Sequence, residues 1–225
     1  MTVAATPQSV LNLATEVANA ARRLPLDGLT VVTGGNISAR DPETGLIVIT
    51  PAGAPYRDMS ASDIVVVDET GQVVYGSRPP SSEMAMHLEL MRRAESRPDF
   101  AVVHTHSPYA TAFSVVRMPI SLVCNEGLGL GTVRVRVTEY AAPGTIALSD
   151  EVRRTLADEP GALAILLANH GAATMADSVT KAYDLALQLE WSARVYHLAM
   201  QIGEPHLLSE EQRTAILSQY HNDDR

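Results

Sequence analysis

The segment FAVVHTH, residues 100–106, constrains the fold more strongly than any other part of the chain. Its apolar residues are typical of a buried β-strand, yet the strand ends in two histidines, His104 and His106. Because side chains alternate across a strand, both histidines lie on one face, about 7 Å apart at about 3.3 Å of rise per residue. Two such imidazoles can converge on one metal ion; the alternative is a histidine pair that is hydrogen-bonded at a sheet edge.

Segments with helical and strand-like patterns alternate along the rest of the chain. Apolar residues at helical spacing predict helices over 6–24, 81–94, 107–116, 149–158 and 178–203. Serines are expected to cap three of them: Ser81 or Ser82, Ser107 and Ser149. Alternating or continuous apolar runs predict two strands within 30–50, a hairpin within 63–76, and strands at 131–140 and 162–169.

This order of elements predicts how the chain is organised as a whole. Interleaved helices and strands, with several hairpins and no internal repeat or linker, indicate a layered α/β fold with a mixed sheet. We therefore expect a single domain over residues 1–225, with flexible ends at 1–6 and 221–225.

The net charge of the chain limits the classes of molecule that it is expected to bind. With 26 acidic and 17 basic residues, the formal net charge is −9, which argues against a surface for nucleic acid or anionic membranes. No apolar run approaches the ~20 residues that span a bilayer, and the N-terminus lacks the pattern of a signal peptide. The single cysteine, Cys124, cannot form an intramolecular disulfide. These features predict a cytoplasmic protein with a small-molecule substrate and no nucleic-acid or membrane partner.

A third histidine and a glutamate extend the candidate metal site. His170 follows the apolar run 162–169, so it also stands at a strand end, where functional residues often collect. Three neutral imidazoles and one oxygen ligand suit zinc or a similar divalent ion. Glu83, at the start of an expected helix, is the candidate fourth ligand. A glutamate at this position also complements the helix dipole, and its spacing alone leaves both roles open.

Five ordered motifs give the sequence a family resemblance. TGGNIS, TPAG, PSSE, HTH and NHG occur in this order between Val10 and Gly203. In this the chain resembles the class II aldolase/adducin family, and within it the zinc-dependent L-fuculose 1-phosphate aldolase group. The resemblance implies a three-layer α/β/α fold with a central mixed, largely antiparallel sheet. It also implies a homotetramer whose active sites lie at subunit interfaces.

The resemblance assigns roles to the residues of the candidate metal site. It implies that one divalent ion per subunit, Zn²⁺ with Mn²⁺ or Co²⁺ as alternatives, is held by Glu83, His104, His106 and His170. Glu83 would also serve as the catalytic acid/base. Tyr140, in TEYAAPGT, would reach a neighbouring subunit's site and assist at the C4 oxygen of the substrate; the alternative is a half-buried strand tyrosine. The tail offers no firm counterpart for a further family tyrosine, although Tyr220 is a candidate.

A substrate-phosphate cradle is also implied by three of the motifs. Its residues would be Gly35, Asn36, Gly53, Ser81 and Ser82. Glycines let backbone N–H groups approach an anion closely, and serines at a helix N-terminus add donors beside the positive end of the dipole. Taken singly, each of these residues is also explained by an ordinary turn or a helix cap. Ala52 stands where the family usually has a hydroxyl residue, so one phosphate hydrogen bond of about 1 kcal/mol or somewhat more is absent.

The activity implied by the resemblance is a metal-dependent retro-aldol cleavage. A ketose 1-phosphate such as L-fuculose 1-phosphate would yield dihydroxyacetone phosphate and an aldehyde through a metal-stabilised enediolate. A decarboxylase, a dehydratase and a pentulose-phosphate epimerase are alternatives on the same fold, and Ala52 keeps a non-phosphorylated hydroxy acid open as substrate. A non-enzymatic, adducin-like scaffold would lack metal ligands, and this chain has all four. His87, four residues after Glu83, is expected to be a structural histidine.

Overall fold

A seven-stranded sheet forms the centre of the protein, whose computed structural model describes residues 6–93 and 99–223, with side chains to residue 218. The strand order is β4-β3-β2-β1-β5-β9-β8, and each neighbouring pair is antiparallel. A single parallel bridge, Val137 to Leu166, adjoins the β8 edge. The strands are β1 (Asn36–Arg40), β2 (Ile47–Ile49), β3 (Val65–Val67), β4 (Val73–Tyr75), β5 (Phe100–Thr105), β8 (Ala164–Leu167) and β9 (Gly171–Ala176).

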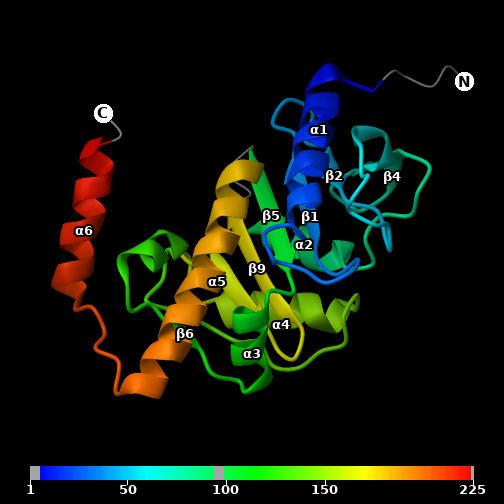
Figure 1. Ribbon diagram of the computed structural model, residues 1–225. Helices are drawn as coiled ribbons and strands as arrows, with labels where there is room; N and C mark the ends of the chain where they lie inside the picture. The colour runs from blue at the N-terminus through cyan, green and yellow to red at the C-terminus, as the bar shows by residue number, and fades with distance from the viewer. Residues whose placement is uncertain (1–5, 94–98, 224–225) are drawn as a thin grey trace, which may run out of the picture.

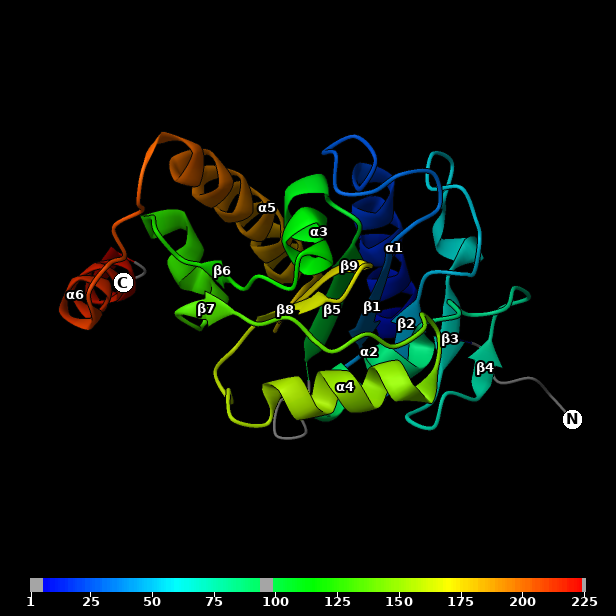
Figure 2. The same ribbon diagram turned by 90° about the horizontal axis from the view of Figure 1, so that it is seen from below.

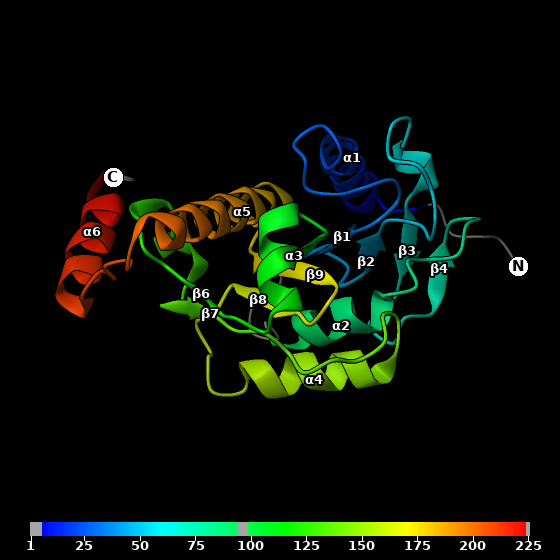
Figure 3. The ribbon, with the colours of Figure 1, turned by 60° about the horizontal axis from the view of Figure 1, so that its bottom comes forward.

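Helices cover both faces of this sheet, as Figures 1, 2 and 3 show from three directions. One face carries α1 (Gln8–Arg23), α3 (Pro108–Val115) and α5 (Val179–Ile202), and the other carries α2 (Met84–Arg92) and α4 (Ile146–Leu156). Each face has its own apolar core, one around α1 and α5 and one between α2, α4 and the sheet. The predicted three-layer α/β/α architecture is therefore confirmed.

The alternation along β5 decides which face the first histidine occupies. Ala101 and Val103 pack in the core around α1 and α5, whereas Phe100 and Val102 pack in the core beneath α2. His104 continues the second series, so its side chain points to the α2 side of the sheet, where it is fully buried. The central place of β5, between β1 and β9, thus brings His104 to the middle of the molecule.

Smaller elements lie around the edges of the sheet. Two short strands, β6 (Ile120–Ser121) and β7 (Arg134–Val135), pair with each other, and α6 (Glu210–Asp223) stands apart from the body except near a 3-10 helix, η2 (Asn125–Leu130). A second 3-10 helix, η1 (Ala61–Asp63), packs near α1. Within the described residues, no helix combines the length and apolarity that a membrane span requires.

Two strand predictions differ from the structure. The strand expected over 131–140 is reduced to β7, because Val135 pairs with the short β6 while Val137 bridges to β8, so the segment crosses between two partners. Conversely, the sequence pattern missed β9, whose segment GAATMA is poor in the β-branched residues typical of strands. Its conformation comes from pairing on both sides, with β5 and β8.

Helix starts and the C-terminal tail also differ from prediction. The fourth helix begins at Ile146 rather than after Ser149, because the Thr145 hydroxyl accepts a hydrogen bond from the Leu148 N–H at 3.3 Å and caps it. Glu83, not a serine, occupies the cap position of α2. The helix α6 was not predicted, and it includes residues 221–223, where a flexible tail was expected; residues 1–5 lie outside the described part.

Two glycines permit close packing at the end of β5. Gly35 has a φ of +74°, and a Cβ there would lie 2.6 Å from the carbonyl oxygen of His104. A Cβ on Gly171, at the start of β9, would lie 2.1 Å from the carbonyl oxygen of Thr105. Neither approach is compatible with a side chain, so both neighbouring strands can reach the histidine end of β5 only because glycine stands at these positions.

Gly171→Ala should destabilise the fold. The new methyl group meets backbone rather than a mobile side chain, and overpacking of this kind lowers the free energy of unfolding by about 1–3 kcal/mol. Urea denaturation measures the change. Gly203→Ala is the matched control, because a methyl group there would meet nothing within 4 Å, and it should change stability by less than about 0.5 kcal/mol. Equal stability of the two variants would contradict the packing argument.

Candidate metal and substrate site

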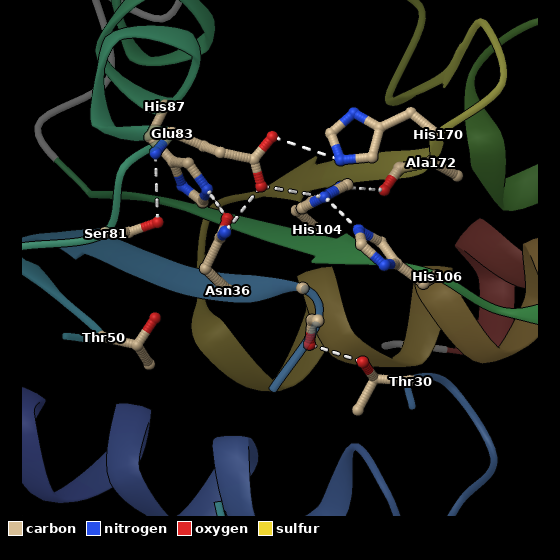
Figure 4. A network of polar contacts seen from close by, with 12 residues as sticks. Thr30, Asn36, Thr50, Ser81, Glu83, His87, His104, His106, His170 and Ala172 are labelled. Atoms are coloured by element: carbon tan, nitrogen blue, oxygen red, sulfur yellow. Dashed lines mark hydrogen bonds and ion pairs between the residues drawn. The ribbon is translucent and has the colours of Figure 1, made fainter. Parts of the chain in front are cut away.

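Four side chains from separate parts of the chain converge beside the end of β5 (Figure 4). His104 lies in β5, His106 directly follows it, His170 occupies the turn between β8 and β9, and Glu83 caps α2. One ligand atom from each of the four lies within 4.8 Å of the others. The structure therefore brings together all four residues that were predicted as metal ligands.

The distances show that the imidazoles aim their Nε2 atoms at a common centre. His104 Nε2 lies 3.0 Å from His106 Nε2 and 3.1 Å from Glu83 Oε2. His170 Nε2 lies 3.3 Å from Glu83 Oε1. The three rings are steeply inclined to one another, with centroids 4.7–4.9 Å apart, so they surround a point rather than stack.

A backbone carbonyl sets the tautomer of His104. Its Nδ1 lies 2.9 Å from the carbonyl oxygen of Ala172 in β9. A carbonyl only accepts hydrogen bonds, so Nδ1 carries a proton and Nε2 is the ring nitrogen that remains to bind a cation in the site. This is the arrangement by which metal-binding histidines are commonly oriented.

The pKa values favour an anionic Glu83 carboxylate beside neutral His106 and His170 rings. Burial, reinforced by the neighbouring histidines, lowers the pKa of His106 to about 3 and that of His170 to about 4. Burial alone would raise the pKa of Glu83, but His104, His170 and the hydrogen bond from Asn36 hold it well below its usual range. At neutral pH, His106 and His170 are then neutral and Glu83 is ionised, which are the protonation states that metal binding requires.

Unpaired polar atoms test whether these residues suit a metal. The adjacent Nε2 atoms of His104 and His106 cannot satisfy each other if both bear lone pairs. Glu83 Oε1 is buried without a hydrogen-bond partner among the described residues. Buried unpaired acceptors are costly, and one divalent cation among them would satisfy all of them. The donor set therefore fits a divalent metal ion, and its mixture of imidazole and carboxylate suits several of them.

A second layer of polar side chains lies behind Glu83. Asn36, in β1, donates from Nδ2 to Glu83 Oε2 at 2.9 Å, and its Oδ1 is hydrogen-bonded to His87 Nε2. The other ring nitrogen, His87 Nδ1, lies 2.6 Å from the hydroxyl of Ser38. His87 was predicted to be structural, whereas Asn36 was predicted in the phosphate cradle. The structure directs the Asn36 side chain at the carboxylate instead (Figure 4).

A cavity beside the four ligands contains the remaining residues of the predicted cradle. Gly53 lies there in a left-handed turn with open space around it, and the Ser81 hydroxyl accepts from the Glu83 N–H at 3.2 Å, which leaves its own proton free to donate. The sequence analysis missed Thr33, Gly34 and Pro143 as lining residues, because only the folded loops bring them here. The full lining is Thr33, Gly34, Gly35, Asn36, Pro51, Ala52, Gly53, Ser81, Ser82, Glu83, His106, Pro143 and His170.

Tyr140, the tyrosine expected to assist catalysis, does not line this cavity in its own chain. It lies in the loop between β7 and α4 rather than in a strand, and it is 62% exposed. Its predicted contribution to a neighbouring subunit remains a prediction. Tyr220 belongs to α6, and its side chain lies outside the described part of the structure.

Comparison with known proteins identifies the family. The model of the class II aldolase and adducin N-terminal domain matches residues 15–197. The chain belongs to this family. A 5-deoxy-D-ribulose 1-phosphate aldolase of Bacillus thuringiensis serovar kurstaki is 34% identical over 205 residues, which cover 91% of this chain and 93% of the relative.

Further relatives of the family cover nearly the whole chain. A 5-methylthioribulose-1-phosphate/5-deoxyribulose-1-phosphate aldolase of Rhodospirillum rubrum is 35% identical over 215 residues, 95% of this chain and 93% of the relative. Among solved structures, an L-fuculose 1-phosphate aldolase matches with a TM-score of 0.85 and 33% identity, covering 98% of this chain and all of the other. The prediction of a lyase of the class II aldolase family is thus confirmed.

Removal of one imidazole should abolish stoichiometric metal binding. We expect the purified protein to hold about one divalent ion per chain and His106→Ala to bind it more than ~100-fold less tightly, because loss of a ligand costs more than loss of an outer-shell partner. Elemental analysis and metal titration measure this. His197→Ala is the control, since His197 is exposed on α5, where it is hydrogen-bonded to Gln201 and its ring lies beside that of Tyr109. Retention of full metal content by His106→Ala would exclude His106 as a ligand.

Proposed function

We propose that this protein is a divalent-metal-dependent aldolase that cleaves a ketose 1-phosphate to dihydroxyacetone phosphate and an aldehyde. The observation that carries the proposal is that three members of the four-ligand cluster, Glu83, His106 and His170, line the cavity that also contains the candidate phosphate cradle. A cation site and an anion site side by side match a substrate with a carbonyl at C2 and a phosphate on C1.

The names of the relatives support a substrate class. Two relatives at 34% and 35% identity are named for 5-deoxyribulose 1-phosphate, and the similar solved structure is named for L-fuculose 1-phosphate. These sugars share a phosphorylated C1, a C2 carbonyl, a C3 hydroxyl and a terminal methyl group. We therefore propose a deoxyketose 1-phosphate as the substrate, with L-fuculose 1-phosphate and 5-deoxyribulose 1-phosphate as the first two compounds to compare.

The residues of the site have separate tasks in this reaction. A divalent ion, Zn²⁺ or alternatively Mn²⁺ or Co²⁺, held by the four ligands would supply Lewis acidity toward the substrate's C2 and C3 oxygens. Glu83 would carry the proton that C3 gains when the C3–C4 bond breaks, through Oε1, which accepts no hydrogen bond from the described residues and lies 3.3 Å from His170 Nε2. Ser81 and Ser82, with the backbone around Gly35 and Gly53, would hold the phosphate.

A residue from a neighbouring subunit would complete the proposed active site. Tyr140 of a neighbouring copy would assist at the C4 oxygen of the substrate, a role that its exposure on its own chain permits. This role requires an oligomer, and we propose a homotetramer of single-domain, cytoplasmic subunits. A non-enzymatic scaffold is disfavoured because all four ligands are present and converge.

Cleavage of the two sugar phosphates tests the proposal. We expect the metal-loaded protein to release dihydroxyacetone phosphate from at least one of them, measured by a coupled assay. A chelator should lower the rate at least ~100-fold, because loss of the Lewis acid removes several kcal/mol of charge stabilisation. Added Zn²⁺, Mn²⁺ or Co²⁺ should restore it. No release by a fully metal-loaded protein would refute these substrates and favour a decarboxylase, dehydratase or epimerase.

The candidate cradle can be tested separately through Ser82. Loss of a hydrogen bond to a charged group costs about 1.5–3 kcal/mol, so Ser82→Ala should raise KM for the sugar phosphate about 10- to 100-fold while kcat changes little. Ala52→Ser adds the hydroxyl found in family relatives and should lower KM. If neither variant changes KM, the cavity does not bind the phosphate, and the unphosphorylated hydroxy-acid alternative gains support.

A further inference from the structure

In the hydrogen-bonded network behind Glu83, the donor and the acceptor of each bond can be assigned. The ionised Glu83 carboxylate can only accept, so the Asn36 group that faces it is the amide NH₂, at 2.9 Å. The amide oxygen of Asn36 therefore faces His87, and it too can only accept, so His87 Nε2 carries a proton. Burial lowers the pKa of His87 to about 3, so the ring is neutral and its Nδ1 accepts from the Ser38 hydroxyl at 2.6 Å.

All four residues of this hydrogen-bonded network are buried. Ser38 and His87 have no exposed surface, and Asn36 and Glu83 are 5% and 6% exposed. Glu83 and His87 lie one turn apart along α2, where the His87 N–H is bonded to the Glu83 carbonyl at 3.3 Å. The Asn36 amide reaches in from β1 and bridges the two side chains, so sheet and helix together define the position of the carboxylate (Figure 4).

The bridge makes the two carboxylate oxygens inequivalent. Oε2 accepts the hydrogen bond from Asn36, whereas Oε1 has no hydrogen-bond partner among the described residues. Rotation of the carboxylate would break the Asn36 bond and leave buried polar groups unpaired, which is unfavourable. The network therefore holds one oxygen and leaves the other for reaction.

We propose that Asn36 and His87 are positioning residues, which hold the Glu83 carboxylate through Oε2 so that Oε1 transfers the substrate proton. This inference rests on the aldolase function proposed above. It also reassigns the Asn36 side chain, because an amide whose oxygen and one N–H are used behind Glu83 is oriented away from a role as a principal phosphate donor. The His87 ring is hydrogen-bonded to Asn36 and Ser38 rather than to a candidate ligand, so it acts on Glu83 through Asn36.

The His87 tautomer tests the network without any substrate. Nitrogen NMR of the ¹⁵N-labelled protein distinguishes a ring protonated at Nε2 from one protonated at Nδ1. We expect a neutral His87 with its proton on Nε2, and a shift of that signal in Asn36→Ala. A His87 protonated at Nδ1, or a doubly protonated ring at neutral pH, would overturn the inference whether or not the protein is an aldolase.

Kinetics of paired variants test the positioning role. His87→Gln keeps one donor for Asn36 and one acceptor for Ser38, whereas His87→Leu keeps neither. We expect His87→Leu and Asn36→Ala to lower kcat about 10- to 100-fold with KM and metal content within about 3-fold of wild type, because a misplaced catalytic group loses rate rather than binding. His87→Gln should stay within about 5-fold of wild type. His197→Leu, an exposed histidine on α5, is the control for the substitution itself.

Proton exchange isolates the step assigned to Glu83. Exchange of a C3 hydrogen of dihydroxyacetone phosphate with D₂O, followed by NMR, requires no aldehyde, and should slow in parallel with kcat. A rise in KM at unchanged kcat for Asn36→Ala, as expected for Ser82→Ala, would overturn the inference and return Asn36 to the cradle. Failure of wild type to exchange or cleave, with the His87 tautomer as expected, would instead refute the proposed function and leave the network intact.

Discussion

The antiparallel pairing of β5 with β1 and β9 is the constraint on which the site depends. In its register, His104 stands opposite Asn36 on one side and Ala173 on the other. The β9 side brings the Ala172 carbonyl to His104 Nδ1, and the β1 side brings the Asn36 amide to Glu83. A slip of one residue would turn His104 to the opposite face of the sheet and separate it from α2. The register of these strands therefore determines the geometry of the site.

The electrostatics of the site follow from what surrounds it. No lysine or arginine is among the described residues that line the cavity, although the proposed substrate is an anion. In the proposed function, attraction would come from a bound cation, from backbone N–H groups at glycine turns and from the hydroxyls of Ser81 and Ser82. Such sources act over short distances, so they can bind an anion locally in a chain whose formal net charge is −9.

The sequence predicted the parts whose signals are local. The pattern of β5 placed two histidines on one face, and the motif around Ser81 predicted the start of α2. Elements whose structure depends on distant partners were missed or misjudged. The small residues of β9 have little intrinsic strand preference and are held in a strand by pairing with β5 and β8. The helix α6 was also missed, although it stands apart from the body of the protein. Asn36 is a similar case within the site. Its motif predicts a turn that binds an anion, but it does not show in which direction the amide side chain points.

By itself, the sequence determined the layered α/β class, the identity of the four candidate ligands and the family, because each depends on residue type, order and periodicity along the chain. The tertiary structure alone decided that the four ligand atoms lie within 4.8 Å of one another, and that Asn36 and His87 brace the carboxylate. The two side-chain hydrogen bonds of Asn36 join residues that are 47 and 51 positions apart in the sequence. Such contacts are set by sheet register and by the packing of α2 on the sheet, which no local pattern encodes.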